Sequence, residues 1–158
     1  MGLGLHGGGA ASVRFLAENG ADVTATDLRS YEILKPTIDS LSDLSLKYVL
    51  GRHDIDDFTK ADIVVKNPAV RNDSPYLTAA LEAGAEIETD ISIFLKLNKR
   101  PVIAVTGSKG KSTTVSAVSH VLKELDPHTD LGGNITVSPL TFYSEEKNTS
   151  GAPVVLEL

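Results

Sequence analysis

The chain has 158 residues, of which 41% are hydrophobic, a formal net charge of −6 and no cysteine. This composition suits a globular chain with its own core, and it excludes disulfides, thiolate metal sites and a cysteine nucleophile. The negative charge and an aromatic content of 5% argue against a nucleic-acid surface. No stretch approaches the roughly 18 apolar residues of a membrane span and no secretory signal is visible, so we expect a cytoplasmic protein without nucleic-acid or membrane partners.

Strands and helices alternate along the first part of the chain. Gly2 to Gly4 looks like the end of a strand, and apolar spacing predicts the elements that follow. The predicted helices are 8–19, 31–41, 75–83 and 90–97, and the predicted strands are 22–26, 46–50, 62–66 and 86–88. Pro36 must lie near an end or a kink of its helix. Ser74 is the expected N-cap of the third helix, and Thr89 or Asp90 that of the fourth.

A polar segment that ends in proline, 96–101, is the best candidate linker. Beyond it the pattern predicts strands at 102–105, 131–134 and 154–158, a long helix at 112–125, and a polar loop at 145–150. The alternation indicates an α/β fold with parallel sheets: a Rossmann-like domain at 1–98, then the incomplete first part of a second α/β domain at 99–158. Because both terminal strands look cut short, we expect a piece of a larger protein.

A phosphate-binding loop, TGSKGKSTT at 106–114, lies between a predicted buried strand and the long helix. Gly107 and Gly110 allow the sharp turn that directs amide N–H groups at phosphate oxygens. Lys111 supplies a positive charge to the β- and γ-phosphates of ATP, and Ser112 offers a hydroxyl to Mg²⁺. The helix N-terminus adds its positive dipole end. The second domain is therefore predicted to be of the P-loop type.

The start of the chain carries a second glycine-rich loop. Gly2-x-Gly4-x-x-Gly7 fits the dinucleotide fingerprint, and Asp27 follows at the expected distance of about 20 residues. Alone this indicates NAD, with the ribose hydroxyls on Asp27, but the same geometry suits another nucleotide diphosphate. The loop in the second domain favours UDP, because a ligase that joins a UDP-linked substrate to another molecule with ATP needs both loops. An NAD-dependent oxidoreductase and a non-catalytic binding module are the alternatives.

Outside the two glycine-rich loops, few residues suggest a catalytic or metal-binding role. Glu157 on a buried strand would by itself be structural, but near a phosphate loop a carboxylate at a strand end can complete a Mg²⁺ site. His53, His120 and His128 show no metal-ligand spacing and are expected to be surface or capping residues. The acidic run at 54–57 is expected to be a solvated loop or a helix start.

The sequence resembles the Mur ligase family of peptidoglycan synthesis. The motifs that carry the resemblance are GLGLHGGG (2–9), TDLR (26–29), ADIVVKNPAV (61–70), TDISIF (89–94), AVTGSKGKSTT (104–114), GGNI (132–135) and VLEL (155–158). Val105 replaces the first glycine of the common P-loop pattern, but the loop of this family has the form TG-x-x-GK-[ST]-[ST], which the chain matches. The spread of motifs points to the branch that adds D-glutamate, with another Mur ligase as the alternative.

The resemblance implies an ATP-dependent ligase that uses Mg²⁺ and acts, as a monomer, on UDP-N-acetylmuramoyl-L-alanine and D-glutamate through an acyl phosphate. Since the family has three domains, this chain would cover the first and the beginning of the second, and we expect it to be inactive alone.

Site residues are also implied. Those for the UDP-sugar are Leu5, His6, Asp27, Leu28, Arg29, Asn67, Pro68, Ala69 and Asn134. Those for ATP are Gly107, Ser108, Lys109, Gly110, Lys111, Ser112 and Thr113. Ser112 and Glu157 would bind the metal, and Lys111 and Glu157 would be catalytic. His6, Asn67 and Ala69 depart from the usual residues of the family at their positions.

Overall fold

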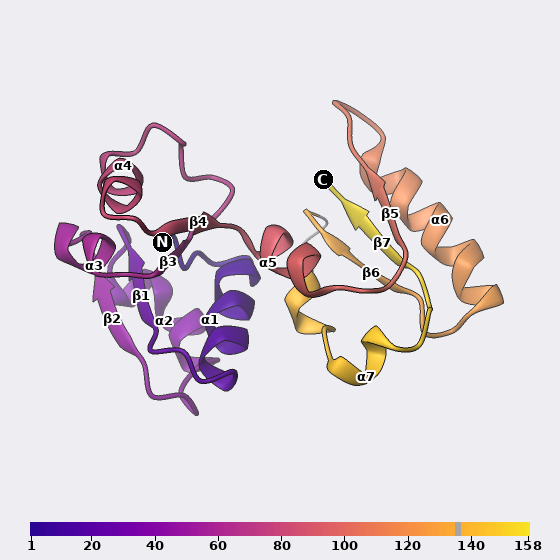
Figure 1. Cartoon of the computed structure of the whole chain (residues 1–158), viewed down its shortest axis with the longest axis horizontal. Helices are drawn as coiled ribbons and strands as arrows, with labels where there is room; N and C mark the ends of the chain where they lie inside the picture. The colour runs from indigo at the N-terminus through magenta and orange to yellow at the C-terminus, as the bar shows by residue number, and fades with distance from the viewer. Residues whose placement is uncertain (135–136) are drawn as a thin grey trace. The chain divides into compact units, whose positions relative to one another are not determined.

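The chain folds into two compact units, Met1–Ser92 and Ile93–Leu158 (Figure 1). The computed structural model describes residues 1–134 and 137–158. Both units combine helices with parallel strands, which confirms the predicted α/β class. The boundary falls inside α5 (Asp90–Leu97), earlier than the division after residue 98 that the sequence suggested. The assignment of a separate function to each part stays a prediction.

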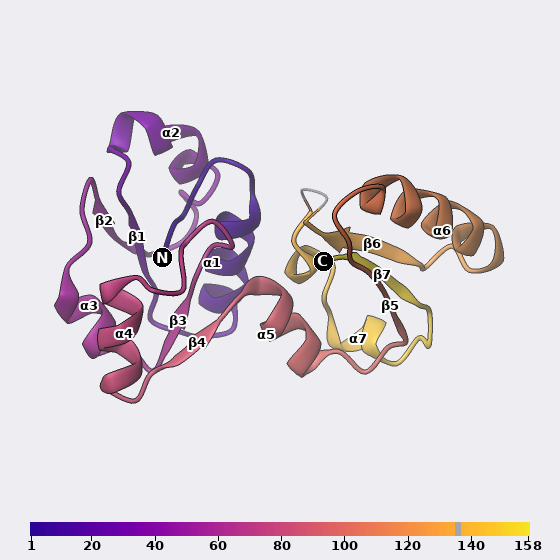
Figure 2. The ribbon, with the colours of Figure 1, turned by 90° about the horizontal axis from the view of Figure 1, so that it is seen from above.

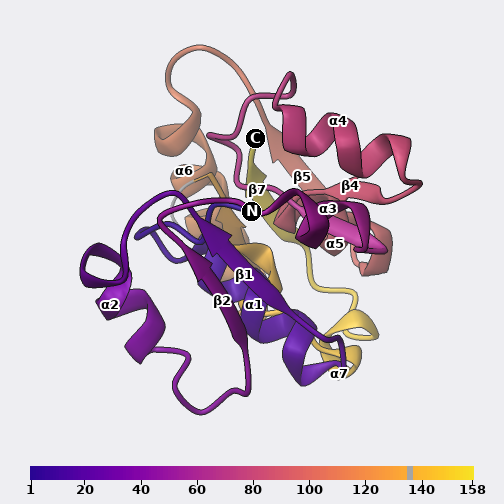
Figure 3. The same ribbon diagram turned by 90° about the vertical axis from the view of Figure 1, so that its left-hand side faces the viewer.

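The first unit contains four strands and five helices, the last of which extends beyond it. In chain order they are α1 (Gly8–Glu18), β1 (Thr24–Asp27), α2 (Tyr31–Asp39), β2 (Lys47–Leu50), α3 (Ile55–Thr59), β3 (Ile63–Val65), α4 (Pro75–Glu82), β4 (Glu86–Glu88) and α5. Strand β1 pairs in parallel with β2, as Figure 3 shows, and β3 pairs in parallel with β4. The register sets Thr24 opposite Lys47 in the first pair and Ile63 opposite Glu86 in the second.

The first residues of the chain connect the two strand pairs. The predicted strand ending at Gly4 is not formed as a regular strand, but the N–H of Gly2 donates to the carbonyl of Thr26 at 2.8 Å. On the other side, the N–H of Asn67 donates to the carbonyl of Met1 at 3.0 Å. Residues 1–2 therefore lie between β1 and the end of β3. The resulting order (β2, β1, residues 1–2, β3, β4) is that of a Rossmann sheet.

Helix α1 packs closely against this first segment because residue 9 is glycine. A Cβ at Gly9 would lie 2.1 Å from the carbonyl oxygen of Leu3, a distance at which no side chain fits. The third glycine of a dinucleotide fingerprint usually allows this helix–strand packing. Here Gly7, the third glycine of the motif, instead takes a left-handed φ of 87° at the N-cap of α1. Two hydrophobic clusters complete the core of the unit: Leu3, Val13, Ala25 and Leu41; and Phe58, Val64, Leu77, Ala80 and Ala85.

The structure confirms some predictions about helix starts and N-caps in the first unit and corrects others. The acidic run forms the start of α3, where Asp54 is the N-cap and accepts from the N–H of Asp56. Pro36 lies inside α2, which ends three residues later at Asp39. Ser74 precedes α4 as expected, but its side chain makes no capping hydrogen bond. Thr89 does cap α5, because its hydroxyl accepts from the N–H of Ser92 at 3.1 Å.

The second unit is a three-stranded parallel sheet with one long helix along it (Figure 2). After α5 its elements are β5 (Val102–Val105), α6 (Lys111–Leu125), β6 (Asp130–Gly133), η1 (Pro139–Thr141), α7 (Glu145–Asn148) and β7 (Val154–Glu157). The strand order is β5-β7-β6, so β7 is central, and all four of its residues are buried. Val115 and Ser119 are the buried residues of α6.

The predicted loop at 145–150 is wrong over its first residues, which form α7. Ser144 is the N-cap, and its Oγ accepts from the N–H of Lys147 at 3.1 Å. Glu145 and Glu146 occupy the first turn, where negative side chains interact favourably with the helix dipole. The serine and the two glutamates were the available signal, but a helix of four residues is too short to show apolar periodicity.

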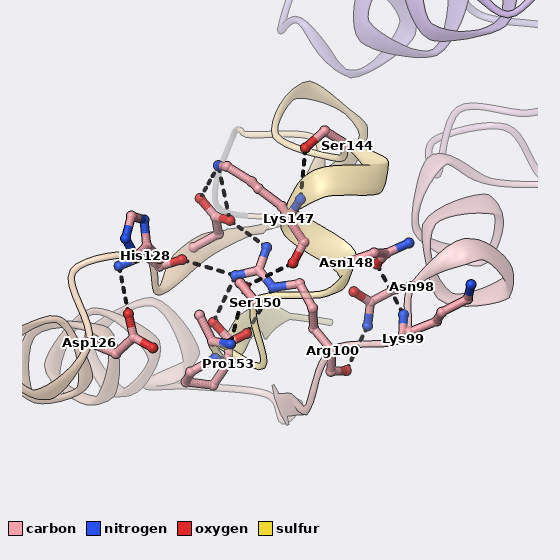
Figure 4. Close-up of polar contacts among 12 residues, drawn as sticks. Asn98, Lys99, Arg100, Asp126, His128, Ser144, Lys147, Asn148, Ser150 and Pro153 are labelled. Carbon is pink, nitrogen blue, oxygen red and sulfur yellow. Dashed lines mark hydrogen bonds and ion pairs between the residues drawn. The ribbon is translucent and has the colours of Figure 1, made fainter.

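Arg100 connects the starting ends of all three strands of this sheet (Figure 4). Its side chain, 2% exposed, lies 2.6 Å from the carboxylate of Asp130 at the start of β6. It also donates to the carbonyl of Ala152, just before β7, at 2.8 Å and to that of His128 at 3.0 Å. Lys147 of α7 adds a second cation at 3.1 Å from Asp130. The start of the sheet is thus held by a buried, well-satisfied ion pair.

Candidate nucleotide-binding sites

In the first unit, three of the predicted substrate-binding segments follow neighbouring strands. Leu5 and His6 follow the opening segment, 27–29 lie at the end of β1, and 67–69 follow β3. Parallel strands bring such ends to one edge of the sheet, and the order reverses between the opening segment and β3. Ligands bind open α/β sheets at this kind of reversal. The structure therefore brings the segments together at the position where a nucleotide is expected.

Short distances between the glycine-rich loop and the segment after β3 support this grouping. A Cβ placed on Gly2 would lie 3.0 Å from the Cβ of Asn67, and one placed on Gly4 would lie 3.5 Å from Asn67 Nδ2. Asn67 also closes its own turn, since its Oδ1 accepts from the N–H of Ala69 at 3.0 Å. The segment after β3 therefore lies directly against the glycine-rich loop.

Asp27 is buried at the centre of this arrangement. Its Oδ2 accepts from the N–H of Gly4 and its Oδ1 from the N–H of Arg29, both at 2.9 Å. The guanidinium of Arg29 lies 3.5 Å from the same carboxylate, whose side chain is only 4% exposed. The carboxylate thus organises two loops. Its burial restricts access by the ribose hydroxyls of a dinucleotide, which is the contact that the NAD interpretation requires.

The residues around Asp27 are open to solvent. Leu28 is 67% exposed, Leu5 is 45% exposed, and His6 also lies at the surface. The loop ends at Gly7, the N-cap of α1, so the helix N-terminus with its free N–H groups lies directly behind it. An exposed, positively polarised loop with apolar neighbours suits a nucleotide diphosphate.

Two residues near this site were missed by the sequence reasoning. Thr37 of α2 donates from its hydroxyl to the carbonyl of Gly4 at 2.9 Å. His53, expected at the surface, is half-buried, with Nδ1 2.5 Å from the hydroxyl of Thr26 and its ring edge-on to Phe58 and Tyr76. Burial lowers the pKa of His53. No motif signals either residue, because each contact joins elements that are distant in sequence.

In the second unit, the predicted phosphate loop follows β5 and ends at α6. Gly107 has φ 144° and Gly110, the N-cap of α6, has φ 78°. The ammonium group of Lys111 donates to the carbonyl of Gly107 at 2.8 Å, so the lysine folds back over the loop. Ser108, Lys109, Ser112 and Thr113 are exposed. The structure therefore gathers all the predicted ATP-binding residues into one loop and the first turn of the helix that follows it.

Glu157 lies beside this loop. In the sheet it is opposite Val105, the last residue of β5, and opposite Gly133 of β6. The residue is 6% exposed, and its Oε2 has no hydrogen-bond partner among the residues that the structure describes. A buried carboxylate oxygen with a free acceptor position fits a hard cation such as Mg²⁺.

The rest of a metal site would have to come from other groups. Over residues 1–134 and 137–158, no cluster of three or more His, Asp or Glu side chains has the geometry to bind a metal. Mg²⁺ is commonly bound through one or two protein ligands plus phosphates and water. Glu157 and the Ser112 hydroxyl therefore fit Mg²⁺ that arrives with a nucleotide.

Asn134 follows β6 and is exposed, and its N–H donates to the carbonyl of Glu157 at 2.9 Å. It thus lies at the same sheet edge as the phosphate loop. Ile135, the last residue of the GGNI motif, lies outside the described residues.

Comparison with known proteins identifies the family to which the chain belongs. A family model described as "Mur ligase MurD-like, N-terminal domain" matches residues 1–89, and the chain therefore belongs to the Mur ligase family. None of the helices in the described part of the chain is long and apolar enough to cross a membrane.

Within the family, the chain is similar to particular ligases. It is 54% identical over 160 residues to the UDP-N-acetylmuramoylalanine–D-glutamate ligase of Borreliella afzelii, with 100% of this chain and 34% of that protein covered. The ligases of the same name from Treponema pallidum and Roseiflexus sp. are 51% and 48% identical, with 30% and 34% of their lengths covered. The chain thus spans about a third of the length of the curated relatives it matches.

Among solved structures, a pseudomurein peptide ligase type C from Methanothermus fervidus is 27% identical, with a TM-score of 0.47. The match covers 94% of this chain and 30% of that one.

Proposed function

We propose that the chain is the UDP-substrate-binding region, together with the start of the ATP-binding domain, of a ligase that adds D-glutamate to UDP-N-acetylmuramoyl-L-alanine. The observation that carries the proposal is the convergence of residues 4–6, 27–29 and 67–69 at the reversal point of a Rossmann sheet. The name shared by relatives about 50% identical over the whole chain supports the particular substrate.

In the first unit, each segment has a distinct role in this proposal. The backbone of Leu5 and His6, with the N-terminus of α1 behind it, would bind the diphosphate. Exposed Leu28 and Arg29 would contact the nucleoside, and Asn67, Pro68 and Ala69 would complete the pocket on the β3 side. Asp27 would act mainly by orienting the loops that its carboxylate bonds.

In the second unit, the loop from Gly107 to Thr113 would bind the phosphates of ATP. Lys111 would exchange the carbonyl of Gly107 for phosphate oxygens and stabilise the negative charge that develops during phosphoryl transfer. Ser112 and Glu157 would hold Mg²⁺, which supplies charge neutralisation for the phosphates. The reaction that this suits transfers the γ-phosphoryl group of ATP to the substrate carboxylate. The amine of D-glutamate then displaces phosphate from the acyl phosphate to form the amide.

The complete reaction needs more protein than this chain. We propose a cytoplasmic, monomeric ligase as the whole protein, acting on small molecules and on neither nucleic acid nor membrane. The 158-residue chain by itself is expected to bind UDP without ligase turnover. Phosphate release at the rate of an intact ligase, with all three substrates present, would contradict this expectation.

Calorimetric titration of the chain with UDP and with NAD tests the proposed site. We expect saturable binding of UDP and none of NAD, and the reverse preference would support the oxidoreductase alternative.

Gly4→Ala should weaken UDP binding, because Gly4 has φ 68° and a side chain there strains the loop. Gly84→Ala is the matched control, since Gly84 has φ 93° with open space around it and lies after α4. If Gly4→Ala and Gly84→Ala changed the affinity for UDP equally, the result would contradict the proposed site.

A further inference from the structure

We propose that the side chains of Thr37 and Asp27 together hold the backbone carbonyl and N–H of Gly4, and so position the glycine-rich loop for a nucleotide diphosphate. We call this pair of contacts the clamp. This inference rests on the proposed function of the first unit, and it assigns a role to Thr37 that no motif indicates. In the clamp, Asp27 Oδ2 accepts from the N–H of Gly4 and the Thr37 hydroxyl donates to the carbonyl of Gly4, both at 2.9 Å. Both polar groups of this one residue are therefore bonded by side chains.

The clamp joins three separate parts of the unit. Asp27 ends β1, Thr37 belongs to α2, and Gly4 lies in the loop before α1. Both residues are buried as a whole, with 3% of Asp27 and 8% of Thr37 exposed. Buried side-chain partners of this kind fix a loop more firmly than exposed ones, because breaking either bond leaves a polar group unsatisfied.

The loop needs such a restraint. Gly2, Gly4 and Gly7 have φ of 77°, 68° and 87°, and each glycine can adopt many other conformations at little cost. Gly2 is bonded to Thr26, and Gly7 accepts from Ala11 within the helix start. In the described part of the chain Gly4 makes no backbone–backbone hydrogen bond. The clamp therefore replaces the missing backbone bonds at the middle glycine.

The geometry of Thr37 also points to a positioning role. Threonine inside a helix commonly bonds the carbonyl of the preceding turn. Thr37 instead bonds a loop 33 residues earlier in the chain. The residues that follow Gly4, Leu5 and His6, are exposed and free to meet a ligand. Because the clamp atoms are occupied within the protein, Thr37 acts on the ligand through the loop, and ordering the loop in advance lowers the entropic cost of binding.

The test compares UDP with uridine as ligands of the full 158-residue chain, by NMR titration. Thr37→Val keeps the shape of the side chain but removes the donor, and we expect it to weaken UDP binding by about tenfold. Uridine binding should be unchanged, because uridine lacks the diphosphate that the loop receives. Thr37→Ser should restore UDP binding. Thr78→Val, which removes a hydroxyl that bonds only the preceding turn of α4, should have no effect on either ligand.

Several results would overturn the clamp. These are normal UDP binding by Thr37→Val, equal losses for UDP and uridine, or no recovery with Thr37→Ser. If Thr37→Val melts below the assay temperature, Asp27→Asn provides the second variant. An amide can accept only one of the two N–H bonds of Asp27, so weaker UDP binding is expected. Because Asp27 also bonds the N–H of Arg29, uridine does not serve as the control ligand for this variant, and unchanged UDP binding would overturn the clamp. Failure of the unaltered chain to bind UDP would contradict the proposed function itself, whereas normal binding with unaffected variants would contradict the clamp alone.

Discussion

At the scale of single residues, Glu157 is a buried carboxylate at the end of β7, with Oε2 unpartnered among residues 1–134 and 137–158. An unsatisfied buried oxygen costs roughly 1–3 kcal/mol, and more for a charged group. A bound cation would remove this cost. Glu157 is therefore expected to destabilise the second unit when it is free of metal and to stabilise it when Mg²⁺ and a nucleotide are bound.

Replacement of Glu157 by Gln separates these two effects. Without Mg²⁺, Glu157→Gln should melt at the same temperature as the unaltered chain or slightly higher, because a buried charge is removed. With ATP present, the rise in melting temperature on adding Mg²⁺ should be lost. Glu124→Gln on exposed α6 is the control and should keep that rise. A full Mg²⁺ response in Glu157→Gln, measured by differential scanning fluorimetry, would refute the metal role.

The sequence predicts the position of Asp27 in the fold but not the contacts that its side chain makes. The motif located Asp27 correctly at the end of a strand, because strand patterns and motif spacing are local. It did not reveal that the carboxylate bonds Gly4 and Arg29, nor that Thr37 completes the clamp. These contacts depend on which helix packs beside which loop, and single-sequence patterns carry no information on that.

At the scale of elements, Arg100 links the starts of β5, β6 and β7 in the second unit. Removing one partner of a buried ion pair leaves the other charge unpaired and typically costs about 3–5 kcal/mol. Lys147 also contacts Asp130 and would compensate in part. The sheet that carries the phosphate loop thus depends on a group at its opposite end.

Arg100→Met should therefore destabilise the second unit by about 3 kcal/mol, the lower end of that range. Amide hydrogen exchange should show faster exchange in β6 and β7 and little change in β1 or β3. Arg71→Met is the control, because Arg71 pairs with Asp73 at the surface, where an ion pair contributes little to stability. Equal protection of β6 and β7 in both variants would show that the Arg100 network is dispensable.

Elements were predicted well where apolar periodicity was long. The helices α1 and α6 and the strands β5 and β7 lie where the pattern put them, within a residue or two. The prediction that β5 is buried was wrong, because its first three residues are exposed. The failures were short or unusual elements. Helix α7 has one turn, and the opening segment pairs on both sides without forming a regular strand. In each case tertiary contacts or capping, which periodicity does not report, decide the local structure.

At the scale of the whole molecule, two glycine-rich loops, each proposed to bind phosphate, occur in separate compact units of one short chain. The first follows the opening segment of a Rossmann sheet, and the second follows β5 of a three-stranded sheet. A single-cofactor dehydrogenase needs only the first loop. The pair of loops, within a chain that spans about a third of its ligase relatives, agrees with a UDP-substrate region joined to the beginning of an ATP-binding domain.

The most direct test of this account is an NMR titration of the isotope-labelled chain with UDP, followed residue by residue. We predict that the amide signals of residues 4–6, 28–29, 67 and 69 shift together and saturate, while those of 106–114 stay unchanged until ATP is added. NAD should leave the first three segments unchanged. Absence of UDP-induced shifts in these segments, or saturable shifts of the same residues with NAD, would contradict the central claim.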